Sequence, residues 1–141
     1  MKISKQYKKI IIEEFYNVVK KMKQSNDLTE KMFFFSATYA VINRVFNIEF
    51  NPTLIFIHMV LNNAYTAIIG RIEAETRGQS IAIKIPKEFF NILEEAIIDI
   101  ANSINKDNKN ELFETLQKIT NLSYLTTGNG YYLFTQGKLT I

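Results

Sequence analysis

One histidine and a few uncharged polar residues are the side chains of this sequence best suited to chemistry. His58 is the only histidine, and imidazole is the side chain best suited to proton transfer near neutral pH. At 100° per residue, Asn62 and Tyr65 share a helix face with His58. Ser36 and Asn43 share one face of the preceding segment in the same way. These five residues predict a polar seam between two otherwise apolar helices.

The predicted seam has three interpretations. Buried amides and imidazoles need hydrogen-bond partners, because an unpaired one costs on the order of 1–3 kcal/mol. In the first interpretation, the seam is a core network that fixes the register of the helices, as a buried Asn does in a coiled coil. Alternatively, it lies at a two-fold interface where the patch meets itself, or it lines a ligand pocket.

The sequence favours a protein that is not an enzyme. Glu73 shares the face of His58 but lies fifteen residues further on, about 22 Å along a helix, which is too far for the two to pair. The lack of cysteine excludes thiol catalysis and Cys-based metal sites, and a single histidine excludes a ferritin-like di-iron site. We therefore predict no catalytic residue, no metal site and no cofactor.

Helical periodicity predicts the elements that position these residues. We expect a mainly α, single-domain bundle of four to five helices over residues 1–141. Asp27 followed by Glu30 has the pattern of a capping box, and Asn51-Pro52 is typical of a helix start. Gly78 is expected to end the third helix. The predicted helices cover approximately residues 3–23, 28–47, 52–76, 87–104 and 110–122.

Two segments have the alternating pattern of strands. Residues 81–85 predict a short extended segment before Pro86. Residues 124–135, with a turn at 128–130, predict a β-hairpin within the C-terminal segment 123–141. Because an isolated hairpin is only marginally stable, we expect it to pair with residues 81–85 in a small three-stranded sheet.

The third helix raises the question of a membrane. Residues 52–70 form a run of nineteen without a charge, which reaches the length of a transmembrane span. His58 and Asn62 lie within this run, where lipid offers no partners. The charges that flank the run are of both signs, whereas a span is expected to have a one-sided basic excess. We therefore expect the helix to be covered by a bundle or an oligomer.

The charge distribution supports a weaker alternative. The net charge of +3 includes +5 in residues 1–48, where Lys5, Lys8, Lys9 and Lys20 lie on the first helix. A basic helix beside a hairpin suits a nucleic-acid-binding regulator. However, the first 43 residues contain no arginine, the usual ligand of base edges and phosphates.

Three functional hypotheses follow from these patterns. The first is a protein-interaction module that self-associates, with a dimer favoured, because two neighbouring helices carry an excess of apolar surface. The second is the nucleic-acid-binding regulator, and the third is a small-molecule enzyme or carrier with its site around His58. No signal-peptide pattern opens the chain, which predicts a cytoplasmic protein.

Overall fold

A computed structural model describes residues 2–78, 85 and 88–127, and this part of the chain contains five α-helices. The mainly helical architecture predicted from the sequence is confirmed. The helices are α1 (Lys5–Gln24), α2 (Leu28–Ile48), α3 (Pro52–Thr76), α4 (Phe89–Lys106) and α5 (Lys109–Thr127).

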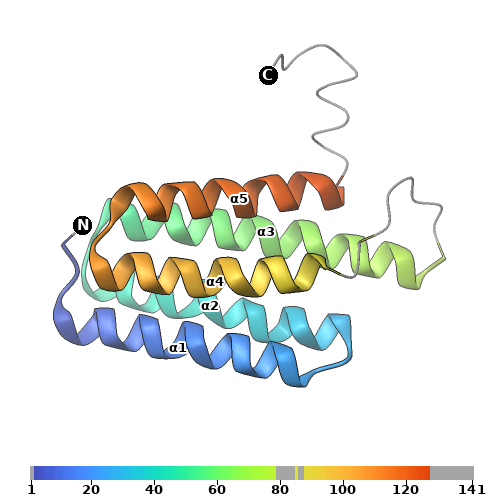
Figure 1. Cartoon of the computed structure of the whole chain (residues 1–141), viewed down its shortest axis with the longest axis horizontal. Coiled ribbons are helices and arrows are strands. Elements are labelled where there is room, and N and C mark those ends of the chain that lie inside the picture. Colours follow the sequence, from blue (N-terminus) through green and yellow to red (C-terminus); the bar gives the residue numbers. More distant parts are fainter. Residues whose placement is uncertain (1, 79–84, 86–87, 128–141) are drawn as a thin grey trace, which may run out of the picture.

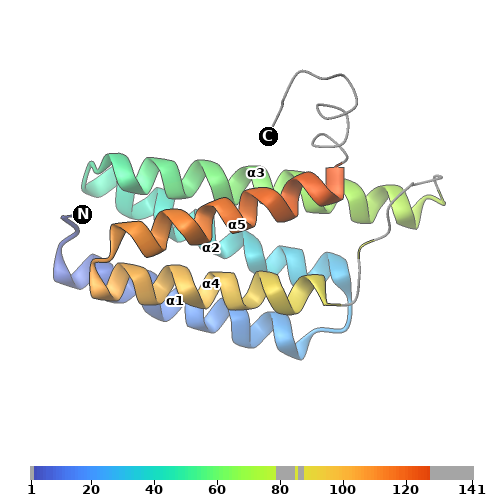
Figure 2. The same ribbon diagram turned by 45° about the horizontal axis from the view of Figure 1, so that its top comes forward.

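The five helices form a closed ring. Each packs against two neighbours, in the order α1, α2, α3, α5, α4 and back to α1. Figures 1 and 2 show that the chain runs in one direction along α1, α3 and α5 and in the other along α2 and α4. In a ring with an odd number of helices, the chain direction cannot alternate between all neighbours. Among the described helices, α3 and α5 are therefore neighbours that run parallel (Figure 2).

Asp27 and Asn51 cap their helices as predicted, but the reciprocal bond of a capping box is replaced, since Asp27 N–H donates to Ser25 Oγ at 3.3 Å. The Asp27 carboxylate accepts from the backbone N–H groups of Thr29 and Glu30 at 2.8 and 3.4 Å. The Asn51 side chain accepts from Thr53 N–H at 2.9 Å and donates to the carbonyl of Lys2 at 2.9 Å. The bonds that the two side chains accept satisfy backbone donors that a helix start leaves without partners. The bond to Lys2 also ties the N-terminal segment to the turn between α2 and α3.

One face of each helix supplies the core inside the ring. On α3 the fully covered positions recur three or four residues apart, at Leu54, Ile57, Leu61, Ala64 and Ile68. Other fully buried side chains come from all the remaining helices and include Ile11, Phe15, Met22, Phe35, Ile42, Leu93, Ile97, Ile100, Leu112 and Ile119. The other faces of each helix are left for the surface or for partners.

The structure corrects the predicted end of the last helix. Residues 124–127, expected to be the first strand of a hairpin, are the last turn of α5. Thr126 is buried there, and its hydroxyl donates to the carbonyl of Ser123 at 2.7 Å. Burial against α3 outweighs the strand preference of Tyr and Thr, because such propensities depend on context. The remainder of the hairpin and the sheet partner at 81–84 lie outside the described residues.

The loop expected at residues 105–110 is shorter than predicted. Helix α4 continues to Lys106, and Asp107 ends it in the left-handed conformation with φ of 56°. Asn108 then caps α5, because its side-chain oxygen accepts from Glu111 N–H at 3.1 Å. Asp and Asn tolerate this geometry, so two residues suffice for the reversal.

Candidate functional site

The predicted polar seam lies where α2 packs against α3, and Tyr39 is at its centre. The Tyr39 ring meets His58 edge to face, with centroids 5.8 Å apart, and it meets Tyr65 at 5.6 Å. Burial raises the pKa of the Tyr39 hydroxyl above 10, repulsion from Tyr65 adds to this, and a hydrogen bond with Ser36 opposes it. The phenol therefore stays protonated at neutral pH. Sequence reasoning did not name Tyr39, although it lies three residues after Ser36 and four before Asn43 and so adjoins the same stripe.

The five predicted residues are distributed from the rim of the helix contact to the surface. Ser36, His58, Asn62 and Tyr65 are half-buried, and Asn43 is exposed. The Ser36 hydroxyl also donates to the carbonyl of Phe33, one turn earlier. The described part of the chain contains no group of three His, Cys, Asp or Glu side chains that could hold a metal. The His58 imidazole, which lies beside the Tyr39 phenol, can donate or accept a hydrogen bond.

Within the described part of the chain, helix α3 has an exposed side. Phe56 is 45% and Met59 is 54% exposed, and Asn63 and Thr66 are exposed on the same side. The helix is long and apolar enough to cross a membrane, and 33% of that stretch is buried inside the protein. A core helix of a soluble protein meets the same criteria of length and composition. The uncharged run identified in the sequence therefore includes a surface as well as core.

The lysines named for nucleic-acid binding lie along α1. Lys5, Lys9 and Lys20 are exposed, and Lys8 is half-buried. Lys9 pairs with Glu13 at 3.9 Å, and both side chains are well exposed to solvent. An exposed pair of this kind contributes little to stability. It does place an acid among the lysines that would meet phosphate.

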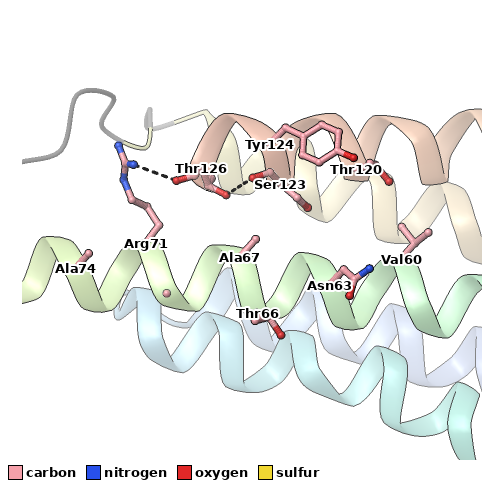
Figure 3. Close-up of a pocket in the computed structure, with 11 residues that line it drawn as sticks. Val60, Asn63, Thr66, Ala67, Arg71, Ala74, Thr120, Ser123, Tyr124 and Thr126 are labelled. Carbon is pink, nitrogen blue, oxygen red and sulfur yellow. Dashed lines mark hydrogen bonds between the residues drawn. The ribbon is translucent and has the colours of Figure 1, made fainter. Parts of the chain in front are cut away.

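A pocket of about 620 Å³ lies between the parallel helices α3 and α5 (Figure 3). Val60 and Ala67 point from α3 towards α5, and Thr120 and Tyr124 approach from the other side. An apolar notch formed by residues including Phe56 and Phe113 shares Thr120 with this pocket and extends it along the helices. The volume is in the range of small-molecule sites.

Arg71 occupies one end of the pocket (Figure 3). Its side chain is only 9% exposed. Nη1 donates to the carbonyl of Thr126 at 3.0 Å, and Nε lies 3.4 Å from Glu75 Oε1. Nη2 is buried and has no hydrogen-bond partner among the described residues. This N–H group beside the pocket can therefore donate a further hydrogen bond.

Sequence reasoning missed this pocket. In the sequence, Arg71 is only a charge that flanks the apolar run, and the residues opposite it were predicted to be a strand. The available signal was a second uncharged stripe, Phe113, Gln117, Thr120 and Tyr124, which recurs at helical spacing. This stripe indicates a pocket lining only because α5 packs parallel to α3.

A buried carboxyl group lies elsewhere, on α4. Glu94 is 3% exposed, and its Oε2 has no hydrogen-bond partner in the described part of the chain. Burial raises the pKa of Glu94, while the positive charges of Lys31 and Lys23 act in the opposite direction. Lys31 Nζ donates instead to the carbonyl of Met22 at 2.6 Å and lies 5.9 Å from the centre of the Phe90 ring.

Comparison of the chain with protein-family models, curated proteins and solved structures finds no match.

Proposed function

We propose that this protein acts by self-association through the outer side of α2 and α3, and that it forms a dimer. We define the association face as Ser36, Ala40 and Asn43 of α2 together with Met59, Asn62 and Thr66 of α3. All six are half-buried or exposed. Two seams of the same character, side by side, suit a two-fold contact in which the patch meets itself.

The observation that carries the proposal is the scarcity of charge on two helices that expose much of their surface. Residues 32–70 contain two charged side chains, Arg44 and Glu49. Glu49 accepts a hydrogen bond from Ser4 N–H at 2.8 Å, so it is engaged within the chain. Surfaces that stay in water usually carry both signs of charge at about a quarter or more of their positions. An uncharged helix pair is typical of a surface that another protein covers.

The dimensions of the two helices support the same proposal. Helix α2 has 21 residues, which corresponds to about 31 Å in length. Two packed helices are roughly 20 Å wide, so their outer side covers about 600 Å² in projection. A stable interface buries about 800 Å² of accessible surface per partner, and accessible area exceeds projected area. The outer side of α2 and α3 as a whole, with the association face within it, is therefore of the size that a small dimer needs.

The proposal is tested by measuring mass in solution for the full chain and one pair of variants. Sedimentation velocity at micromolar concentration is expected to give twice the chain mass. Met59→Lys should shift the protein to monomer, because it places a desolvated charge in each half of a two-fold interface. Tyr16→Lys is the control, since Tyr16 is 45% exposed on α1 and its hydroxyl donates to Asn102 of α4, a helix that does not contact α2 in the described part of the chain.

Two outcomes would contradict self-association through this face. A strict monomer at micromolar concentration would overturn it outright. A dimer that survives Met59→Lys would place the contact elsewhere. Binding to neutral lipid vesicles, or salt-dependent retention on heparin, would favour the membrane or nucleic-acid alternative instead.

A further inference from the structure

We infer that the pocket between α3 and α5 binds a long-chain carboxylate, with the carboxylate on Arg71 and the apolar chain along the groove. This site is separate from the predicted seam, since His58, Asn62 and Tyr65 do not line it. It shares Thr66 with the association face, but the rest of its lining comes from α5 and from residues of α3 outside that face.

The chemistry of the head group follows from Arg71. Of its three nitrogens, Nη1 is engaged at 3.0 Å, Nε at 3.4 Å, and Nη2 has no partner among the described residues. A buried donor without an acceptor is costly, and guanidinium favours planar oxygen pairs such as carboxylate. The ligand that best completes this group is therefore an anion with two oxygens.

Glu75 leaves much of the guanidinium charge available. Its Oε1 is 3.4 Å from Arg71 Nε, at the long end of hydrogen-bond distances. The same oxygen accepts from Ile85 N–H at 3.4 Å, so it is shared between two donors. The Glu75 side chain is also 31% exposed, so water screens its attraction for Arg71.

The body of the ligand follows from the rest of the lining. On α3, Val60, Ala67 and Ala74 are apolar and Gly70 has no side chain. Asn63 and Thr66 are polar, and the Thr66 hydroxyl donates to the carbonyl of Asn62 at 3.1 Å. Ser123 and Thr126 donate their hydroxyl hydrogens to carbonyls of their own helix, at 2.9 and 2.7 Å. These hydroxyls therefore do not offer further hydrogens to a ligand. The middle of the groove favours an apolar chain over a polyol or a sugar.

The length of the groove fits such a chain. From Arg71 to Phe56 is fifteen residues of α3, or about 22 Å. One acyl chain spans about half of a bilayer core that is ~30 Å thick, or roughly 15 Å. The chain would therefore run past Thr120 towards the notch at Phe56 and Phe113, where the two rings meet edge to face at 5.5 Å.

The test uses cis-parinaric acid, a polyene carboxylate that fluoresces in apolar sites, with the full chain. We expect saturable binding that is displaced by dodecanoate and far less by 1-dodecanol, which lacks the carboxylate. Arg71→Met should weaken dodecanoate binding about tenfold or more, since a charge-assisted bond is lost. The matched control Arg44→Met removes an exposed arginine on α2 and should leave binding unchanged.

A second variant keeps the test decisive if Arg71→Met does not fold. Gly70→Leu adds a side chain at the pocket wall, and a Cβ at this position meets no atom within 4 Å. It should fold and block binding. Absence of saturable binding to the unmodified protein would overturn the inference. So would binding that neither Gly70→Leu nor Arg71→Met weakens, or equal displacement by the acid and the alcohol.

Discussion

Replacing Gly70 by Ala should stabilise the protein, although the position lines a pocket. Gly70 is exposed in the interior of α3, the 25-residue helix from Pro52 to Thr76. A Cβ built there meets no atom within 4 Å, so the methyl group causes no collision. What remains is the helix propensity difference between Gly and Ala, about 1 kcal/mol in favour of Ala.

The expected shift in melting temperature follows from the size of the chain. An unfolding entropy of about 2.1 cal/mol/K per residue gives about 0.3 kcal/mol/K for this protein. A gain of about 1 kcal/mol then raises the midpoint by roughly 3 °C. Thermal and urea unfolding followed by circular dichroism would measure both quantities, at one fixed protein concentration and without added ligand.

Gly78→Ala is the matched control. Gly78 follows the end of α3 with φ of +70°, a conformation that costs an L-residue roughly 1 kcal/mol or more. The same substitution should therefore destabilise the protein here. Loss of stability in Gly70→Ala would refute the reasoning, because it would mean that folding or association requires position 70 to have no side chain.

Three other predictions concern single side chains. Glu94→Gln should stabilise the protein by about 1 kcal/mol at neutral pH, with Glu95→Gln as an exposed control. Because burial raises the pKa of Glu94, the contribution of this group to the free energy of unfolding is most favourable at low pH and is lost as pH rises through the raised pKa. Urea titrations should therefore show that Glu94→Gln is no more stable than the unmodified protein in acid. Asn51→Ala, which removes the cap of α3 and the bond to the N-terminal segment, should cost about 1–2 kcal/mol in the same titration, and no loss would contradict the role of the cap. His58→Ala should cost about 0.5–1.5 kcal/mol through its ring contact with Tyr39 yet leave dodecanoate binding intact, and loss of binding would place the ligand at the seam.

The helices were predictable because their signals are local. Asp27 and Asn51 accept from backbone groups two or three residues away, so their caps depend on nothing distant. The helical period itself likewise depends only on residues three or four apart in the chain. The sequence also predicted polar side chains where α2 packs on α3, but it did not single out Tyr39, whose ring contacts His58 and Tyr65.

Tertiary packing decided the features that the sequence left open. Residues 124–127 are helical because α5 lies on α3, a contact between segments more than fifty residues apart. The same contact buries Arg71, which in the sequence is an ordinary flanking charge. Composition determined that this chain forms amphipathic helices with an uncharged pair among them. The order of those helices around a five-membered ring determined which uncharged face became core, which stayed exposed, and where a parallel pair left a pocket.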